Sequence, residues 1–202
     1  SEMCIRDRKY KDINGDGQIT SEDITDIGNP WPAFTYGLNL GLSWKFIDFS
    51  IFFQGIGRRH WYPKANTIAF WGPYARPYAS WIPKDFHEMY WSEENPDAYF
   101  PRPRGYVALS GTNRELTAVN DRYMQNIRYC RLKNLTIGYT LPKKWTRKVL
   151  IENLRVYFTG ENLATWSPIH SDYIDPEMAA MNDEMRTYPW QKTYMFGVDV
   201  TF

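Results

Sequence analysis

The sequence predicts an all-β fold, namely a segment of an antiparallel, up-and-down transmembrane β-barrel with long loops at one end. Apolar and polar residues alternate in five separate segments, as on strands that face hydrocarbon on one side and water on the other. Aromatic residues lie near the ends of several apolar faces, as expected at the two membrane interfaces. The connections are alternately long and short, which places the long loops together.

The first expected strand, residues 34–44, alternates without a miss over eleven residues, enough for a tilted membrane span. The next three are 47–55, 129–141 and 154–162, and Phe52 is an apolar exception on the polar face of the second. The last strand, 193–202, has Met195 as its one exception. We expect its residues Phe196, Gly197, Val198, Val200 and Phe202 to form the C-terminal signal of the barrel.

The loop lengths indicate an orientation. Residues 58–127 and 163–192 are long outer connections, whereas residues 45–46 and 142–153 are short inner ones, and residues 9–33 form a further extracellular loop before the strands and loops of 34–202. Five strands cannot close, because about eight is the smallest membrane barrel and an open edge leaves backbone groups unsatisfied in lipid. We therefore expect this chain to be one wall of a larger barrel.

Composition excludes several classes of protein. A formal net charge of +1 without long basic runs gives no footprint for nucleic acid. No run of eighteen apolar residues predicts a membrane helix, but barrel strands escape that test because half of each strand is polar. Residues 1–8 (SEMCIRDR) lack the features of a secretory signal and fit nothing that follows, so we interpret them as an artefact and expect an upstream region to be missing.

Residues 12–23 (DINGDGQITSED) have the spacing of a calcium loop, in which hard oxygen ligands surround the ion and glycine permits the sharp turn. The last of the twelve loop positions is Asp23 rather than the usual bidentate Glu, so a switching EF-hand is not expected. We expect a structural calcium ion; the alternative is a turn without an ion, held by side-chain to backbone hydrogen bonds. The expected ligands are Asp12, Asn14, Asp16, Gln18 and Asp23.

Five stretches resemble, in the correct order, the C-terminal portion of the SusC/RagA-type TonB-linked outer-membrane proteins (TonB-dependent receptors) of Bacteroidetes. They are YKDINGDGQITSEDITDIGNPWPAFTYGLNLG, FIDFSIFFQG, YCRLKNLTIGYTLPKKW, LRVYFTGENLATWS and KTYMFGVDVTF. The resemblance implies the last five strands of a barrel of about 22 strands. It also implies a protein of the cell outer membrane, surrounded by outer-membrane lipid, that imports oligosaccharides or peptides with a SusD-like surface lipoprotein. Energy would come from the TonB complex through the N-terminal region that this chain lacks.

The sequence gives little support for catalysis, because His60, His87 and His170 are scattered without a nucleophile motif or a metal-binding pair. No catalytic or substrate-binding residue is therefore predicted. The long loop is rich in aromatic residues, and we expect most of them to pack the loop against itself and its neighbours and a few to contact the partner lipoprotein. These aromatic residues are Trp61, Tyr62, Phe70, Trp71, Tyr74, Tyr78, Trp81, Tyr90, Trp91, Tyr99, Phe100 and Tyr106.

The sequence is compatible with two alternative functions. A soluble β-sandwich binding module with a structural calcium loop would require a second sheet over the face of Leu38, Leu40 and Leu42. A calcium-dependent polysaccharide enzyme with a dockerin would require a second calcium loop and a carboxylate pair, and the sequence shows neither.

Overall fold

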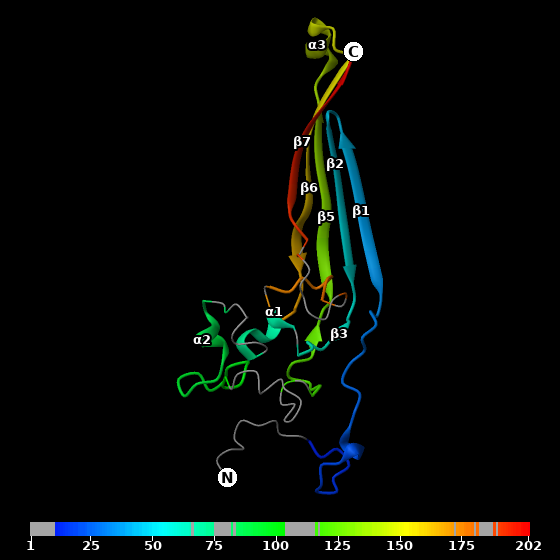
Figure 1. Cartoon of the computed structure of the whole chain (residues 1–202). Helices are drawn as coiled ribbons and strands as arrows, with labels where there is room; N and C mark the ends of the chain where they lie inside the picture. The colour runs from blue at the N-terminus through cyan, green and yellow to red at the C-terminus, as the bar shows by residue number, and fades with distance from the viewer. Residues whose placement is uncertain are drawn as a thin grey trace.

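The computed structural model describes residues 11–65, 67–74, 82, 84–103, 116, 118–171, 173–179, 181, 188 and 190–202. Five long strands form one sheet whose spatial order, β1-β2-β5-β6-β7, is also their order in the chain (Figure 1). All neighbouring pairs are antiparallel, so the predicted up-and-down fold class is confirmed. The strands are β1 (Thr35–Trp44), β2 (Ile47–Ile56), β5 (Tyr129–Thr140), β6 (Asn153–Trp166) and β7 (Thr193–Thr201).

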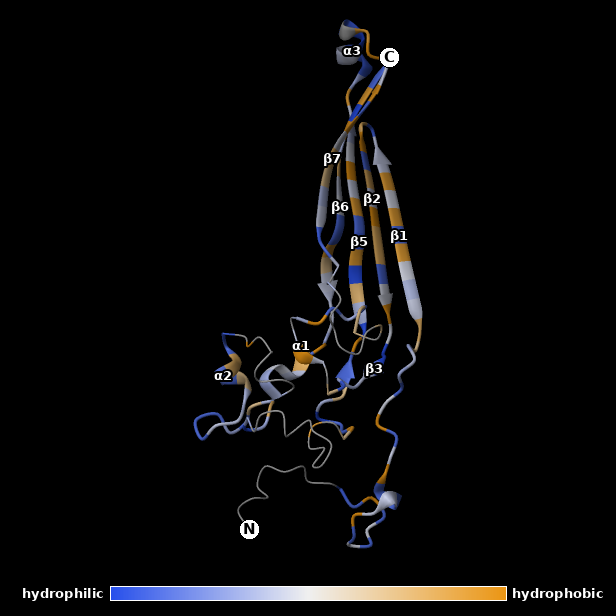
Figure 2. Cartoon of the chain, viewed as in Figure 1, coloured by the Kyte–Doolittle hydropathy of each residue, from blue (hydrophilic) through white to orange (hydrophobic). Residues whose placement is uncertain are grey.

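The register places most of the apolar residues of the five strands on one face. One cross-strand row consists of Leu42, Phe49, Ile137, Phe158 and Phe196. Hydrophobic and hydrophilic residues alternate along the long strands, as Figure 2 shows. Leu42 is 67% exposed and Phe196 is 83% exposed, and no second sheet covers this face in the part of the chain that the structure describes. So large an apolar face requires hydrocarbon or a partner surface.

The opposite face carries the polar residues, and two aromatic side chains on it pack over glycines. The ring of Phe52 lies beside Gly37, where an added Cβ would be 3.3 Å from its Cε2 atom. The ring of Tyr157 covers Gly197 on β7, where an added Cβ would be 2.2 Å from Cζ. An aromatic ring laid over a glycine fills the space that the missing side chain leaves in a strand. The structure gives no account of Met195.

A β-bulge interrupts both sides of β5. The register shifts between Leu132 and Asn134 against β6, where Asn162 has a left-handed φ of 51°. Asparagine tolerates that conformation better than most residues. A bulge changes the phase of the alternation, so the sequence pattern stops at the bulge although the strand does not. This is why β6 ends at Trp166 and not at residue 162 as the sequence indicated.

The inner end of the sheet has short connections. Lys45, with a φ of 56°, turns the chain from β1 into β2. Between β5 and β6 lie the short helices α3 (Lys143–Thr146) and η5 (Arg147–Val149), which end at the left-handed residue Leu150. The C-terminus lies at this same end (Figure 1).

The hydrophobic core lies in the loops at the opposite, outer end. The chain between β2 and β5 contains β3 (His60–Trp61), paired with β4 (Gln125–Asn126), and its described residues include three short helices. These helices are α1 (Ile68–Trp71), η3 (Gly72–Tyr74) and α2 (Phe86–Met89). The buried core residues are Phe70, Trp71, Tyr74, Phe86, Phe100, Leu116, Tyr123, Ile127, Ile174 and Ala179. The last two belong to the β6–β7 connection, so two loops far apart in sequence share one core.

The expected packing of the loop aromatics is thus confirmed for the buried ones, while Tyr78, Trp81 and Tyr106 lie outside the described residues. Residues 1–8 also lie outside them. The described part of the N-terminal loop, from residue 11 on, contains the 3-10 helix η2 (Ser21–Asp23). Within the described ranges, no helix has the length and apolar character needed to cross a membrane.

Candidate functional site

The polar face of the sheet carries a charge cluster near its inner end. The guanidinium of Arg155 on β6 donates two hydrogen bonds to Asp48 on β2, from Nε at 3.0 Å and from a terminal nitrogen at 2.7 Å. A third, at 3.1 Å, goes to Asp199 on β7. Arg155 therefore links β6 both to its neighbour β7 and to β2, which lies on the far side of β5. A bidentate arginine–carboxylate pair is stronger than a single neutral hydrogen bond.

The strand between Asp48 and Arg155 makes this contact possible because it has a glycine there. Gly138 of β5 pairs with Asp48, and an added Cβ would lie 2.3 Å from Asp48 Oδ1 and 2.7 Å from a terminal nitrogen of Arg155. No side chain fits at this position unless the ion pair moves. The glycine thus acts by leaving room, since its φ is not in the left-handed region.

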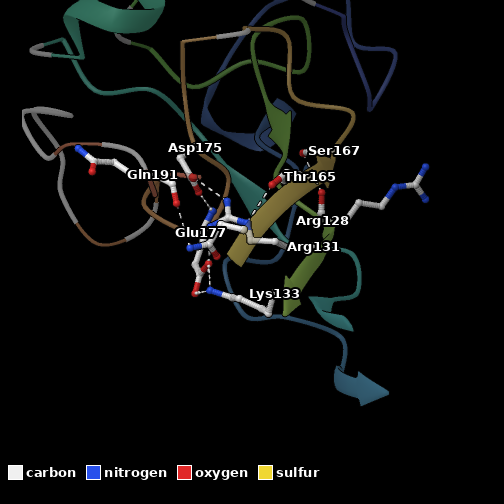
Figure 3. A network of polar contacts seen from close by, with 9 residues as sticks. Arg128, Arg131, Lys133, Thr165, Ser167, Asp175, Glu177 and Gln191 are labelled. Carbon is white, nitrogen blue, oxygen red and sulfur yellow. Dashed lines mark hydrogen bonds and ion pairs between the residues drawn. The ribbon is translucent and has the colours of Figure 1, made fainter. Parts of the chain in front are cut away.

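A second charge cluster holds the β6–β7 connection against the outer part of the polar face (Figure 3). Arg131 on β5 donates to Asp175 at 2.6 Å, to Glu177 at 2.9 Å and to the Thr165 hydroxyl at 2.9 Å. Lys133 donates to the same Glu177 carboxylate at 2.9 and 3.2 Å. We call the residues Arg131, Lys133, Asp175 and Glu177 the outer latch.

The outer latch is largely removed from water. The side chain of Arg131 is 1% exposed, and those of Asp175 and Glu177 are 10% and 14% exposed. A buried charge is tolerated when it is paired and hydrogen-bonded, and is costly when one partner is removed. The Lys133 ammonium also lies 4.6 Å from the centroid of the Trp190 ring, which brings the end of the same connection to the latch.

The loop core is rigidified by hydrogen bonds from its aromatic residues. Trp71 is fully buried, and its indole N–H donates to the carbonyls of Pro63 and Lys64 at 3.2 and 3.0 Å. The Tyr74 hydroxyl donates to the carbonyl of Pro101, and burial raises its pKa. The ring of Tyr99, whose pKa is also raised mainly by burial, lies 3.7 Å from that of His170. These contacts make the outer loops a packed unit.

A cavity of about 250 Å³ opens beside this core. Its apolar wall comes from α1 and α2, and its polar groups come from Asp85, His170, Ser171 and Tyr173. The lining residues include Ile68, Phe70, Phe86, Phe100, His170 and Tyr173. The cavity is lined by both long connections, so its shape depends on their shared core.

The expected calcium loop forms a tight turn whose carboxylates accept backbone amides. Asp12 accepts from Gly15 at 2.6 Å and Gly17 at 2.8 Å, and both glycines have a left-handed φ. Asp23 accepts from Ile13 at 2.7 Å and Thr20 at 2.8 Å, and these two bonds lower its pKa. These hydrogen bonds are the ones that the alternative without an ion requires.

The remaining expected ligands lie on the same turn. The Asp16 carboxylate accepts from the backbone N–H of Gln18 at 2.7 Å, and the Asn14 side-chain oxygen accepts from the backbone N–H of Asp16 at 3.0 Å. Considering only the residues that are described, no group of three or more His, Cys, Asp or Glu side chains is arranged to hold a metal ion. Calcium binding therefore stays a prediction.

The residues of the expected C-terminal signal lie on β7 and just after it. Phe196, Val198 and Val200 alternate along the apolar face, and Phe202 follows with 85% of its surface exposed. Gly197 lies on the polar face under Tyr157. Their role as a signal is untested by this geometry and stays a prediction.

Sequence reasoning missed both charge clusters. Asp48, Arg155 and Asp199 all occur on the polar faces of expected strands, so their position there was a usable signal. Pairing them also needed the register, because Asp48 and Arg155 are separated by a whole strand. The outer latch had a weaker signal, since Asp175 and Glu177 lie in a loop with no periodicity.

Comparison with known proteins gives two curated relatives from Formosa agariphila. TonB-dependent receptor P26 is 30% identical over 213 residues, and TonB-dependent receptor P3 is 30% identical over 207 residues. Each match covers 96% of this chain, and the chain spans 19% of the length of each relative. No family model matches the chain.

Among solved structures, the RagAB peptide importer matches in two states. The open-open state gives a TM-score of 0.59 at 24% identity, and the closed-closed state gives 0.59 at 23% identity. Both matches cover 92% of this chain and 19% of the solved chain. At this identity the likeness shows a shared fold.

An open antiparallel sheet with one apolar face, one charged face and all its long loops at one end is a wall of an outer-membrane type of β-barrel. Together with the curated relatives, it shows that the chain belongs to the TonB-dependent receptors, and its fold is shared with the RagAB peptide importer. Both curated relatives are named as receptors.

Proposed function

We propose that the receptor containing this chain imports oligosaccharides or peptides across the outer membrane. It would work with a SusD-like surface lipoprotein and draw energy from the TonB complex. The observation that carries this proposal is the two-faced sheet, with a continuous apolar face opposite a face bearing the Arg155 cluster and the outer latch. Such a wall fits between lipid and an aqueous passage.

The two faces support a location in the outer membrane. Strands of nine to fourteen residues are long enough to cross a bilayer when tilted. Leu38 and Leu40 in the middle of β1 are 49% and 50% exposed, so hydrocarbon contacts would complete their burial. The lipid of the outer membrane is the partner that this face fits.

The outer loop unit supports a role in substrate or partner contact. Its aromatic core fixes two long connections in one shape, and the cavity beside it is open to a ligand or a partner side chain. The solved structures that share the fold are of a protein named as a peptide importer, which favours peptides within the proposed substrate class.

The soluble sandwich module is not supported by the observed sheet. That alternative requires a second sheet over the face of Leu38, Leu40 and Leu42, and the only other sheet among the described residues is the short pair β3–β4 at the outer end. Leu42 therefore has no apolar layer above it in this region.

The proposed function is tested by fractionation and growth. A tagged full-length receptor is expected in the outer-membrane fraction, and its deletion is expected to abolish growth on one oligosaccharide or peptide source while growth on a monosaccharide or free amino acids continues. Re-introducing the intact gene is the control. Recovery of the receptor as a soluble periplasmic protein, or normal growth of the deletion strain on every such source, would contradict the proposal.

We also propose that the loop of residues 12–23 binds a structural calcium ion. Support comes from its ligand spacing and from the left-handed glycines Gly15 and Gly17, which fold the chain tightly enough to bring Asp12 and Asp16 to one turn. Calorimetric titration of the receptor is expected to show one site that Asp16→Asn weakens. The control is Asp26→Asn, which removes a carboxylate after the loop. No binding at millimolar calcium would reject the ion.

A further inference from the structure

The inner end of the sheet carries four cations without acidic neighbours in the same segment. Lys143, Lys144, Arg147 and Lys148 lie on α3 and η5, and residues 141–151 contain no Asp or Glu. All four side chains are exposed, and none makes an ion pair within the part of the chain that the structure describes. We call these four residues the inner basic cluster.

The same short segment exposes large apolar side chains. Trp145 is 60% exposed and Leu150 is 86% exposed, whereas Thr146 between them is 3% exposed. The Thr146 carbonyl accepts the amide of Ile151, which fixes the segment back on the start of β6. A segment that exposes cations together with a tryptophan and a leucine has the composition of a helix that lies at a membrane interface.

The cluster lies where the apolar face of the sheet ends. α3 begins directly after β5, and it lies at the inner end together with the C-terminus (Figure 1). The neighbouring β1–β2 turn repeats the combination, since the Lys45 ammonium lies 4.7 Å from the centroid of the exposed Trp44 ring. Aromatic residues and cations at the edge of an apolar band mark the depth at which lipid headgroups begin.

We propose that the inner basic cluster binds the phosphate groups of anionic phospholipids in the inner leaflet, with Trp145 and Leu150 inserted among the first acyl carbons. This inference rests on the proposed location in the outer membrane. Charge complementarity selects the lipid, since a cation near an anionic surface adds about 1 kcal/mol, or about fivefold, to association. The inner ends of β5 and β6 are thereby anchored to the bilayer.

The test measures lipid preference in the full-length receptor, reconstituted in vesicles of phosphatidylcholine that contain a small fraction of spin-labelled phosphatidylglycerol or spin-labelled phosphatidylcholine. The motionally restricted fraction of each probe gives the preference for the anionic lipid. The wild-type receptor is expected to prefer phosphatidylglycerol severalfold. The quadruple variant Lys143→Gln, Lys144→Gln, Arg147→Gln, Lys148→Gln is expected to lose most of that preference.

The matched control removes four exposed cations from the opposite end of the sheet: Lys11→Gln, Arg58→Gln, Lys84→Gln and Lys192→Gln. This variant is expected to keep the preference. An unchanged preference in the quadruple variant, or an equal loss in the control, overturns the proposal. If the quadruple variant fails to assemble, the wild-type receptor still decides: its preference must fall as sodium chloride rises, because screening weakens phosphate contacts.

Two further outcomes separate this inference from the proposed location. A receptor that cannot be reconstituted and shows no restricted lipid of either kind refutes the membrane location. A receptor that restricts both lipids equally is in the membrane but does not select anionic headgroups, which refutes the lipid site alone. The variant Lys143→Arg, Lys144→Arg, Lys148→Arg keeps the charge and is expected to keep the preference.

Discussion

The ion pairs of Arg155 with Asp48 and Asp199 depend on Gly138. Any Cβ at this position would overlap with atoms of both Asp48 and Arg155, because it would lie closer to them than van der Waals contact allows. The bidentate pair must therefore break or move. We expect Gly138→Ala to destabilise the receptor by about 1–2 kcal/mol, which is a charge-assisted hydrogen-bond loss reduced for partial exposure to water. The urea midpoint of the assembled receptor measures this change.

The matched control for this substitution is Gly41→Ala. Gly41 lies on the polar face of β1, and an added Cβ there meets nothing within 4 Å. Both substitutions add one methyl group to a strand glycine of the same face, so only the contact with the ion pair differs. Equal stability of the two variants would show that the Arg155–Asp48 pair contributes nothing measurable.

Asp23 gives the N-terminal loop a dependence on pH. Backbone hydrogen bonds from Thr20 and Ile13 stabilise its carboxylate and hold its pKa below the usual value. A group with a lowered folded-state pKa contributes stability above its unfolded pKa of about 4 and loses it as the pH falls through the folded value. We therefore expect protease cleavage within residues 12–23 to be constant from pH 8 to 5 and to rise below about pH 4.

The control for the pH experiment is Asp23→Asn in calcium-free buffer. This variant cannot lose a charge at residue 23, so we expect its cleavage to be faster than that of the wild type at neutral pH and to change little on acidification. An acid-resistant protease is used so that the enzyme itself is not limiting. If cleavage of the variant rises below about pH 4 as much as cleavage of the wild type does, Asp23 is not the responsible group.

At the scale of the element, the outer latch connects a loop to a strand. Arg131→Met would leave Asp175 and Glu177 as two nearly buried carboxylates with Lys133 as their remaining cation. Removing one partner from a buried ion pair costs about 3–5 kcal/mol. We expect the segment 173–179 to open, with amide hydrogen exchange faster by about a hundredfold or more.

Arg128→Gln is the control for the latch. Arg128 lies one residue before β5, and its side chain is exposed, so it supplies the same loss of charge without a buried partner. Exchange in 173–179 should match the wild type in this variant. If Arg131→Met also leaves that exchange unchanged, the β6–β7 connection is held by its hydrophobic contacts at Ile174 and Ala179 and not by the latch.

The orientation of β1 is tested by a pair of neighbouring residues. Leu40 lies on the apolar face and Asn39 on the polar face, because successive side chains of a strand point to opposite sides. A lysine on the lipid face at mid-bilayer costs about 2–4 kcal/mol, whereas a lysine facing the aqueous side is tolerated. We expect Leu40→Lys to reduce the assembled receptor in the outer membrane severalfold and Asn39→Lys to leave it unchanged, as judged by heat-modifiable gel mobility. The reverse result would assign the two faces the other way round.

Strand alternation was sufficient to predict the sheet, but not the contacts across it. The run from Phe34 to Trp44 alternates fully because each face of β1 keeps one environment along the whole strand, apolar on one face and polar on the other. The alternation failed at Asn162, where a bulge changes the phase while the strand continues to Trp166. Side chains such as Arg131 and Glu177 meet only after the whole loop has folded, and their 46-residue separation carries no periodic signal.

At the scale of the whole molecule, the open edges of the sheet determine what surrounds it. β1 and β7 each pair on one side only within the described structure, and the unpaired backbone groups of a strand cost several kcal/mol each in lipid. The curated relatives are about five times as long as this chain, which is long enough to hold the additional strands that a closed barrel requires. The edges are therefore expected to pair with other strands of the same receptor.

This expectation can be tested by comparing the chain alone with the full-length receptor. Expressed alone and refolded in detergent, the 202-residue chain has to satisfy its edges with other copies, so light scattering after size-exclusion chromatography is expected to show oligomers or aggregates. In the full-length receptor, the outward amides of β1 and β7 should be as protected from hydrogen exchange as those of the central strand β5. A stable, heat-modifiable monomer of the chain alone would mean that five strands can satisfy their own edges, and the sheet would then not need a larger barrel around it.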